Sequence, residues 1–575
     1  MSAARPWLRH YGDVAPTLDY PQVTMVDAVM ATAERLPEAT AYDFLGTTAT
    51  YRELGEAIDR CAGAFAALGL RAGDRITISM PTSPQGVIAF YAAGKLGAVA
   101  SLIHPLSSAS EIERYLNLSR SRFALTLDAF YDRFAEVGPR TSLETLVLSR
   151  ITDGLPALKR LGFRLTRGRK IPRVPADANV RWWSQLMAVE HPAVPQARVE
   201  THDLAAILFS GGTTGTPKGI MLSHRNFICE GLELAAWIGL SESDTVLAVL
   251  PIFHGFGLGA LIHAPFMSGA KVVMVPVFSA EVVSKLIRTK RPTLMAGVPT
   301  LYDTLSRDPS LRRADLSCLR AAFSGADTLP QPVKERFERL VAEGGGSVRL
   351  LEGYGLTEAV TAIIGTPLHE YREGSAGVPF PDTLATICRP ESDAELAPGE
   401  DGELCVSGPA VMLGYLDDPE ATAVTLRVHA DGRTWLHTGD IGRMDEDGFF
   451  YFASRLKRMI KSSGFNVYPA EVEAVLCEHP AVAEACVVGV PEEAQGERIK
   501  AFVVPKDQVE GNNELAAALI DHCRQRLLKW SCPRDVEFLR ELPVTRLGKI
   551  DCTALVRQEV AKAEARARAS TPASS

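Results

Sequence analysis

Short, continuous runs of apolar residues recur between about Val23 and Ser454 and alternate with helix-like stretches. The runs include RITISM, AAILFS, TVLAVLP, KVVMVP, PTLMAGVP and RAAFSG. A strand that is covered on both faces is apolar at nearly every position rather than at every second one. The pattern therefore predicts an α/β fold with a large, multi-layer N-terminal domain of mostly parallel sheets. We expect ligands at the carboxyl ends of its strands.

The most membrane-like run begins at Val246, VLAVLPIFHGFGLGALIHAPFMSGAKVVMVPV, and is long enough to span a bilayer. Prolines, histidines and a lysine interrupt it, and such residues are costly in a bilayer. A strand, a buried helix and a second strand explain the run better than a membrane span.

The character of the chain changes at about Ser454. Beyond it we predict a helix over Pro469–Cys477, a strand pair at ACVVGVP and IKAFVVP, and a helix near Glu514–Leu528. A length of about a hundred residues suits a small independent domain. We therefore expect a large domain over residues 1–453, a hinge at 454 and a small, mobile α+β domain over 455–557. The small, polar residues 558–575 predict a disordered tail.

Composition excludes several function classes. The chain is 46% hydrophobic and 23% charged, as in soluble globular proteins, and its formal net charge of −8 argues against nucleic acid as a partner. Ten scattered cysteines without a C-x-x-C pair favour reduced thiols. Because neither end carries a recognisable secretion, lipidation or peroxisomal signal, we expect a cytoplasmic protein.

One basic stretch, residues 159–173 (KRLGFRLTRGRKIPR), contains no acidic residue and interleaves its charges with apolar side chains. Such a stretch favours a solvated surface linker. Peripheral contact with an anionic membrane surface is the alternative.

The candidate chemistry begins with SGGTTGTPKG, Ser210 to Gly219, directly after an apolar run. It is not a Walker A loop, because Gly219 stands where a hydroxyl residue would be needed. The stretch nevertheless suits phosphate, since glycines expose backbone N–H groups, hydroxyls donate and a lysine adds positive charge. The candidate phosphate-binding residues are Ser210, Thr213, Thr214, Gly215, Thr216 and Lys218.

SGGTTGTPKG resembles the signature of the adenylate-forming superfamily, which comprises acyl- and aryl-CoA synthetases, adenylation domains of peptide synthetases and luciferases. Further motifs of that family follow in its order, so the resemblance covers the chain from about Val23 to Leu555. They are PIFHGFG (251–257), SGAD (324–327), EGYGLTEA (352–359), HTGD (437–440), SRLKRMIKSSGFNVYPAEVE (454–473) and PVTRLGK (543–549).

The resemblance implies that a carboxylate attacks the α-phosphate of ATP to give an acyl-adenylate, which a thiol then accepts. It assigns Mg²⁺ coordination to Glu358 and places Thr213, Thr214 and Lys218 near the departing pyrophosphate. ATP, Mg²⁺ and coenzyme A are the implied cofactor, metal and co-substrate.

The same resemblance implies a nucleotide site. Gly325, Ala326 and Tyr354 are expected against the adenine, Asp440 accepts from the ribose hydroxyls, and Arg455 makes a second nucleotide contact. The remaining residues expected in the adenine-binding loop are Glu352, Gly353, Gly355 and Thr357.

Lys549 matches the lysine that stabilises charge while the adenylate forms. The small domain is then expected to rotate, so that the loop around Gly464 faces the thiol substrate. Many family members have Asp before the Arg at the hinge, whereas this chain has Ser454. Rotation is still expected, but charge contacts that favour one state could be lost.

His254 matches a residue beside the carboxylate channel, where the acid is expected; a buried histidine with a purely structural role is the alternative. Gly255, Gly257 and Gly259 leave room for a long or bulky acyl group, and no acidic residue stands at an obvious pocket position to hold an amino group. The basic stretch resembles in placement a segment of bacterial long-chain acyl-CoA synthetases. We therefore expect a medium or long fatty acid.

Several alternatives stay open. An aryl (4-coumarate-type) CoA ligase and an acyl-AMP ligase that loads a carrier protein use the same chemistry. A luciferase-like oxidase would also consume oxygen after adenylation. A non-catalytic binding protein is disfavoured, because Lys549, Glu358 and Asp440 are all present. The sequence leaves the oligomeric state open.

Overall fold

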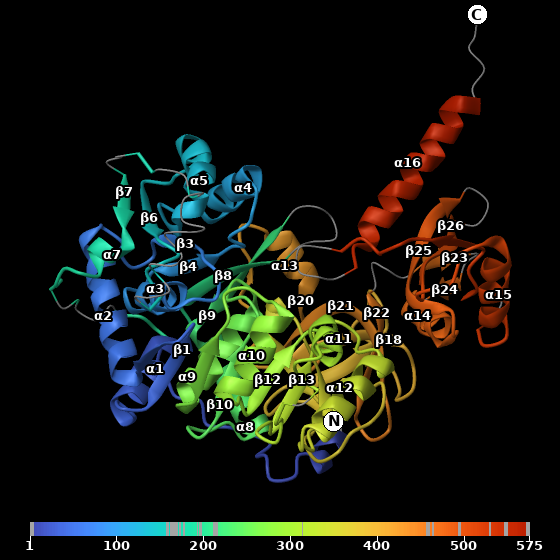
Figure 1. The fold of residues 1–575 in the computed structure, drawn as a ribbon, viewed down its shortest axis with the longest axis horizontal. Coiled ribbons are helices and arrows are strands. Elements are labelled where there is room, and N and C mark those ends of the chain that lie inside the picture. The colour runs from blue at the N-terminus through green and yellow to red at the C-terminus, as the bar shows by residue number, and fades with distance from the viewer. Residues whose placement is uncertain are drawn as a thin grey trace, which may run out of the picture. The chain divides into compact units, whose positions relative to one another are not determined.

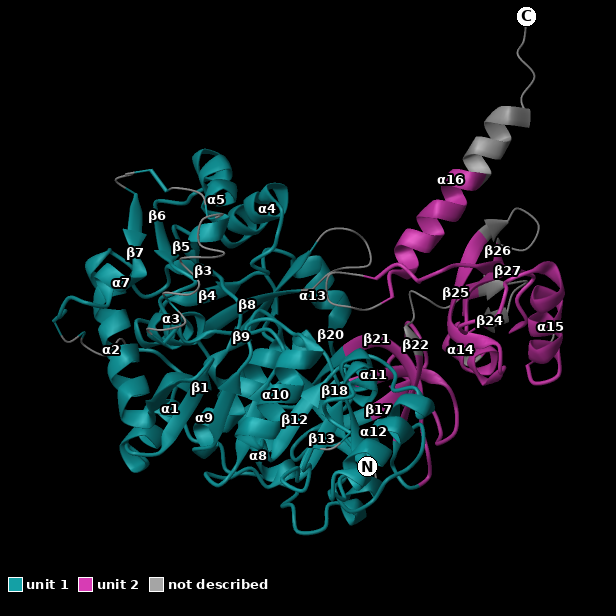
Figure 2. Cartoon of the chain, in the orientation of Figure 1, with its two compact units in different colours: residues 1–385, 406–436, 447–449 teal, residues 386–405, 437–446, 450–575 magenta. Residues whose placement is uncertain are grey.

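The computed structural model describes residues 5–156, 160, 171, 174–175, 179–192, 194, 198–210, 217–312, 314–455, 460–462, 465–467, 469–492, 496–527, 531–544 and 550–570. The chain divides into two compact units (Figure 2). Unit 1 comprises Met1–Ala385, Val406–Leu436 and Asp447–Phe449, and unit 2 comprises Thr386–Cys405, His437–Glu446 and Phe450–Ser575.

The first large sheet of unit 1 has nine strands, and its centre is parallel. The strand pairs at both edges, β14–β15, β15–β16 and β1–β2, are antiparallel. In spatial order the strands are β16 (Val378–Pro379), β15 (Ala362–Gly365), β14 (Leu350–Gly355), β13 (Ala321–Ser324), β12 (Leu294–Gly297), β10 (Thr245–Ala248), β11 (Lys271–Met274), β1 (Thr40–Phe44) and β2 (Thr47–Thr50).

The second large sheet has eight strands and is parallel except for the pairs β8–β9 and β9–β19. In spatial order its strands are β19 (Gly414–Tyr415), β9 (Lys218–Ser223), β8 (Leu204–Ser210), β4 (Val99–Leu102), β3 (Arg75–Ser79), β5 (Phe123–Leu127), β6 (Thr145–Ser149) and β7 (Val180–Trp182). The six apolar runs in the sequence form β3, β8 and β10 to β13, so the prediction of parallel-rich sheets is confirmed.

Helices alternate with these strands along unit 1 (Figure 1). They are η1 (Pro6–His10), α1 (Met25–Arg35), α2 (Tyr51–Ala67), α3 (Pro84–Lys95), α4 (Ala109–Ser119), η2 (Asp128–Phe130), α5 (Tyr131–Val137), η3 (Gly138–Arg140), α7 (Trp183–Leu186), α8 (His224–Ile238), η5 (Phe256–His263), α9 (Ala264–Ser268), α10 (Ala280–Lys290), α11 (Pro299–Arg307), α12 (Gln331–Glu343), η6 (Thr357–Ala359) and α13 (Pro419–Thr425).

The core of unit 1 lies between its sheets and helices. Helices α10, α11 and α12 cover one face of the nine-stranded sheet, where Val283, Tyr302 and Phe337 pack with residues of β10 to β14 (Figure 1). The run from Val246 forms β10, the π-helix η5 with α9, and β11, as predicted. None of the helices in the described ranges is both long and apolar enough to cross a bilayer.

A further five-stranded sheet contains β17 (Leu384–Cys388), β18 (Gly402–Ser407), β21 (Thr434–Met444) and β20 (Leu426–Val428), with β22 (Phe450–Arg455) paired to β21. The division between the units falls inside β17, β18 and β21. It therefore differs from the single boundary predicted at residue 454. Ser454 lies within β22 and pairs with Ile441, so the chain does not enter a new sheet at that residue.

The last five-stranded sheet lies wholly within unit 2. Its strands follow the order β24 (Phe465–Val467), β23 (Ile460–Ser462), β26 (Gly496–Pro505) and β25 (Val482–Glu492), and β27 (Asp535–Phe538) pairs with β26. Helices α14 (Pro469–Glu478) and α15 (Asn513–Arg524) pack on it through an apolar cluster that includes Val472, Leu476 and Leu519. These elements match the predicted helices and strand pair.

Helix α16 runs from Cys552 to Ser570 and so includes part of the predicted tail, whose disorder stays a prediction. Residues 558–570 are rich in alanine, glutamate, lysine and arginine, which favour helix strongly. The sequence prediction gave more weight to their small size and polarity than to this propensity.

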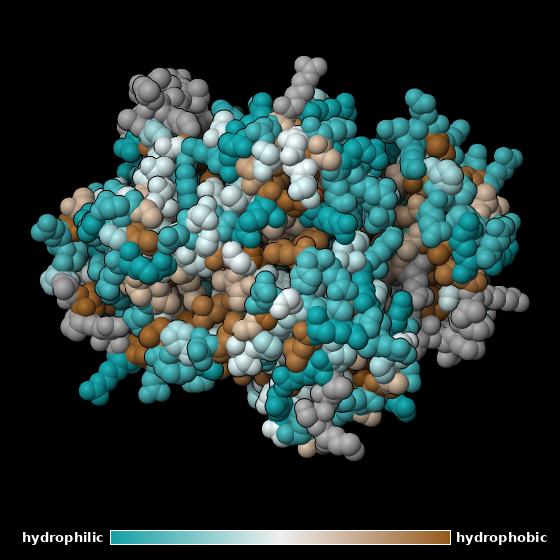
Figure 3. All heavy atoms as spheres, turned by 90° about the horizontal axis from the view of Figure 1, so that it is seen from below, coloured by the Kyte–Doolittle hydropathy of each residue, from teal (hydrophilic) through white to brown (hydrophobic). Residues whose placement is uncertain are grey.

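On the face that Figure 3 shows, hydrophobic residues are exposed in small groups among hydrophilic ones.

Candidate active site

A mostly apolar cavity in unit 1 lies where β12, β13 and β14 end. Seven of the residues predicted for the nucleotide and the acid line it: His254, Gly325, Ala326, Gly353, Tyr354, Gly355 and Thr357. The remainder of its wall includes Leu234, Trp237, Ile238, Val246, Leu261, Leu294 and Phe380. This location agrees with the rule that open α/β sheets bind ligands at the carboxyl ends of their strands.

His254 reaches the cavity from the segment that precedes the π-helix η5. Its Nδ1 accepts a hydrogen bond from the Phe256 backbone N–H at 3.2 Å. An imidazole nitrogen that accepts carries no proton, so the proton of the neutral ring is on Nε2. His254 can therefore act as a donor through Nε2.

The cavity wall contains two non-glycine residues with positive φ, Ala326 at 68° and Val360 at 62°. Positive φ is uncommon for alanine and an outlier for a β-branched valine. The Val360 backbone lies so close to Gly255 that a Cβ on that glycine would be only 1.7 Å from the Val360 carbonyl oxygen, so this approach requires glycine at 255. Such strained residues cluster at binding sites, where the surrounding structure fixes them.

Three residues from distant parts of unit 1 meet beside this wall. The Tyr415 hydroxyl donates to Glu358 Oε1 at 3.0 Å, and Lys218 Nζ lies 4.4 Å from the centre of the Tyr415 ring. Burial, followed by the Glu358 charge, raises the pKa of Tyr415, so the phenol keeps its proton. The Glu358 carbonyl also accepts from the Met412 N–H at 2.8 Å. One phenol thus contacts a carboxylate through its hydroxyl and an ammonium group through its ring.

The glycine-rich stretch joins β8 to β9, which pair antiparallel with Ser210 opposite Lys218. This register brings the two ends of the predicted phosphate loop together. A capping box then starts α8, as the Ser223 N–H donates to Asn226 Oδ1 at 2.8 Å. Asn226 Nδ2 in turn donates to the Pro409 and Val411 carbonyls, in the segment that leads into β19 and Tyr415. Local sequence signals therefore anchor both sides of the Lys218–Tyr415 pair.

Glu352 lies in the middle of β14, directly before the cavity residue Gly353. Burial raises the pKa of its carboxyl to about 7, although the Lys334 charge and the Leu329 N–H both act to lower it. Its backbone is fixed to Thr366, whose hydroxyl donates to the Glu352 carbonyl at 3.0 Å. Glu352 to Gly355 lie within strand β14. The sequence had suggested an adenine-binding loop for these residues.

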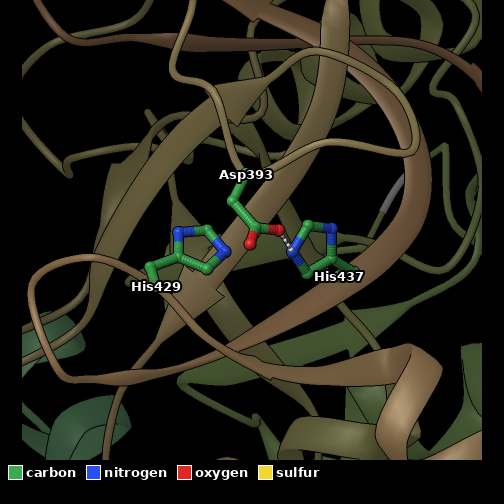
Figure 4. Close-up of side chains that lie close together, drawn as sticks. All are labelled: Asp393, His429 and His437. Atoms are coloured by element: carbon green, nitrogen blue, oxygen red, sulfur yellow. Dashed lines mark ion pairs between the residues drawn. The ribbon is translucent and has the colours of Figure 1, made fainter.

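Asp440, predicted for the ribose, lies in unit 2 on β21, opposite Arg455 of β22. A buried carboxylate contacts the backbone just before Asp440, because Glu403 Oε1 accepts from the Gly439 N–H and its Oε2 lies 2.9 Å from His437 Nδ1. On the other side of the ring, His437 Nε2 is 3.5 Å from Asp393 (Figure 4). Carboxylates on both sides fix the imidazole, and with it the part of β21 that contains Asp440.

Several predicted residues lie outside the described residues: Thr213, Thr214, Gly215, Thr216, Gly464 and Lys549. The side chains of Ser210 and Arg455 also lie outside the described part of the structure. Of the basic stretch 159–173, only Arg160 and Ile171 are described. Their predicted roles therefore stay predictions.

Sequence reasoning missed two fully buried carboxylates on α8, Glu230 and Glu233. Burial raises the pKa of both well above the usual value of a glutamate, which favours the protonated form. Glu230 does not line the cavity but lies behind its wall, with Oε2 2.9 Å from where a Cβ on Gly259 would be. The signal was available, because Glu230 shares a helical face with Leu234 and Trp237, which line the cavity.

Known proteins match this chain over nearly its whole length. A family model described as AMP-binding enzyme matches residues 29–416, and the model of the AMP-binding enzyme C-terminal domain matches residues 471–549. A long-chain-fatty-acid–CoA ligase of Bacillus subtilis is 36% identical over 568 residues, covering 97% of this chain and 99% of the relative. A feruloyl-CoA synthase of Amycolatopsis is 34% identical, covering 90% and 95%. The crystal structure of ATP-bound MatB from Rhodopseudomonas palustris superposes with a TM-score of 0.81 at 26% identity, covering 93% and 99%.

Proposed function

The chain belongs to the AMP-binding enzyme family, and on that premise we propose that it is an AMP-forming acid:CoA ligase. It joins a medium or long fatty acid to AMP with release of pyrophosphate, and then transfers the acyl group to coenzyme A. An aryl-CoA ligase is the second candidate, because a feruloyl-CoA synthase is 34% identical to the chain.

The observation that carries the proposal is the cavity in unit 1. It combines loops predicted for adenine, around Gly325 and Tyr354, with a long apolar wall suited to an acyl chain. His254 lies on the same wall and can donate through Nε2 to a carboxylate. A single cavity that accepts a nucleotide, a carboxylate and an apolar chain fits acyl-adenylate formation.

Catalysis of the first step requires stabilising charge on the phosphates while the carboxylate attacks. Lys218 supplies positive charge, and Tyr415 holds the Glu358 carboxylate in place through its hydroxyl. The donor set fits Mg²⁺, which binds one or two carboxylates together with substrate phosphates, so Glu358 would hold the ion. The metal would neutralise phosphate charge when it is bound.

The acid preference rests on the composition of the wall. Apolar side chains make up most of it, as suits an alkyl chain, and its few polar side chains include His254, Thr357 and Thr361. Aryl acids are also apolar, so the two candidate classes differ in length more than in polarity. Since each buried methylene contributes about 0.8 kcal/mol, an affinity of the enzyme for its acid that rises with each added methylene would favour the fatty acid.

Carboxylate-dependent exchange of labelled pyrophosphate into ATP tests the proposal, using fatty, aryl and amino acids. We expect exchange with fatty acids of increasing length and little with amino acids. The absence of exchange with every acid would refute adenylation. Exchange that is strongest with hydroxycinnamic acids would instead select the aryl candidate.

The acceptor and the lysine need separate assays. Exchange without thioester formation on addition of CoA would indicate a carrier protein as the acceptor. Lys549→Ala is expected to abolish exchange but to convert supplied acyl-AMP and CoA at near the wild-type rate, since the lysine acts on charge that develops only in the first transition state. Loss of both half-reactions in a folded variant would contradict that role.

A further inference from the structure

Two thiols of unit 2 lie in direct contact although 66 residues separate them in the sequence. Cys486 Sγ on β25 is 3.2 Å from Cys552 Sγ, which belongs to the first residue of α16. A disulfide bond requires an S–S distance of about 2.05 Å. Approach of the sulfurs by little more than 1 Å would therefore close a bond between the strand and the helix.

The surroundings hold the two thiols together. Cys486 is fully buried in an apolar cluster with Val488, Phe502 and Leu555, and Cys552 packs at the edge of that cluster. The start of α16 is fixed as well, because the Ala554 N–H donates to Asp551 Oδ1 at 2.9 Å and the Asp551 N–H donates to the Pro543 carbonyl at 2.7 Å. The contact is thus part of the packed interior and not an encounter of two mobile side chains.

The two thiols differ in access. Cys552 is partly exposed, whereas Cys486 is buried. An oxidant in solution can therefore reach Cys552 first, and the buried thiol can then resolve the product. A partly exposed thiol beside a second thiol is the arrangement typical of redox-sensitive cysteines.

We propose that Cys486 and Cys552 form a reversible disulfide and that the bond slows the adenylation step. The oxidant is a low-molecular-weight disulfide such as glutathione disulfide. The Cys552 thiolate attacks one of its sulfurs, and one glutathione thiolate leaves and takes up a proton. The Cys486 thiolate then attacks Cys552 Sγ and releases the second glutathione. The two cysteines lose two electrons and two protons in total, and the glutathione disulfide gains them.

The expected effect on adenylation rests on the proposed function and on the position of Cys552 in the chain. Val544 and Ile550 form an isolated antiparallel bridge, and Lys549 is the residue before Ile550. A bond from Cys552 to β25 would fix the chain immediately after that bridge. Because Lys549 must approach the adenylating centre, a tighter anchor is expected to slow the first half-reaction.

The test treats the full-length protein with glutathione disulfide and maps its peptides by mass spectrometry. We expect a Cys486–Cys552 crosslinked peptide lacking two hydrogens, lost again on addition of dithiothreitol. Pyrophosphate exchange should fall about tenfold in the oxidised protein and recover on reduction. Cys552→Ser should prevent both changes, whereas Cys318→Ser, at a partly exposed thiol of unit 1, should leave both intact.

Oxidised protein without the crosslink would overturn the assignment of the site. A crosslink formed with exchange unchanged would overturn the effect on adenylation. Should the reduced protein catalyse no exchange with any acid, the proposed function fails, while the crosslink is still judged by mass alone. Cys552→Ser is preferred to a substitution of the buried Cys486, because the Cys552 side chain is partly exposed. A melting curve equal to that of the wild type would confirm that the Cys552→Ser variant is folded.

Discussion

Glu352 makes the stability of unit 1 depend on pH in a direction opposite to that of most carboxylates. Burial raises its pKa from 4.5 to about 7. Between these values the folded protein keeps the proton that the unfolded chain has lost. Glu352 therefore contributes most to stability below pH 4.5, and that contribution falls as the pH rises towards 7. Replacement by glutamine removes the titration while retaining shape.

The size of the effect follows from the two pKa values. Each pKa unit corresponds to about 1.36 kcal/mol, and integration from pH 5 to pH 8 gives a loss of about 2.5 kcal/mol in the free energy of unfolding. Glu352→Gln should lack this loss. The free-energy difference between variant and wild type should then shift by about 2.5 kcal/mol in favour of the variant over that pH range.

Urea unfolding followed by tryptophan fluorescence at pH 5 and pH 8 measures the effect. Five of the six tryptophans lie in unit 1, at positions 7, 182, 183, 237 and 435, so the signal reports mainly on that unit. Glu335→Gln, at an exposed position of α12, is the matched control. If Glu352→Gln and the control changed equally with pH, within about 0.5 kcal/mol, the reasoning from burial would be refuted.

Three further predictions concern the site. Tyr415→Phe removes a hydrogen bond to a carboxylate, worth about 1.5–3 kcal/mol, so pyrophosphate exchange should fall roughly 10- to 100-fold. Conversion of supplied acyl-AMP should persist. Equal loss of both half-reactions would contradict a role of Tyr415 at the phosphates. Gly255→Ala places a Cβ 1.7 Å from the Val360 carbonyl oxygen and should lower the melting temperature and abolish exchange. Gly353→Ala, whose Cβ meets nothing nearer than 3.6 Å, should melt like the wild type. Similar melting temperatures of the two variants would argue against the close approach of Gly255 to Val360. Glu403→Gln weakens the contacts to His437 and to the Gly439 N–H and should raise the KM for ATP several-fold with a smaller change in kcat. An unchanged KM would show that the position of Asp440 does not depend on the carboxylate.

The fold was predictable from the sequence where burial alone decides structure. The run AAILFS became β8 and KVVMVP became β11, because strands covered on both faces must be apolar throughout. The cavity residues around Gly325 and Tyr354 were predictable through family motifs.

What was not predictable depends on pairing between distant segments. Tyr415 meets Glu358, 57 residues earlier, only because β19 pairs with β9 and brings the phenol to η6. The burial of Glu230 was missed because glutamate is rarely buried without a partner. Helix α16 was missed because composition was judged there without helix propensity.

The contact between Val360 and Gly255 has a consequence for anyone redesigning the pocket. Position 255 must stay glycine whatever side chain stands at 360, because the backbone carbonyl of residue 360 occupies the space that a side chain at 255 would need. Enlarging the pocket is easier from the other partner: glycine in place of Val360 tolerates the φ of 62° without steric cost and also frees space beside Gly259, whose absent Cβ would lie 3.1 Å from Val360 Cγ1. A library that varies 360 while keeping 255 and 257 as glycine should therefore yield folded enzymes with altered acid range more often than one that varies all three.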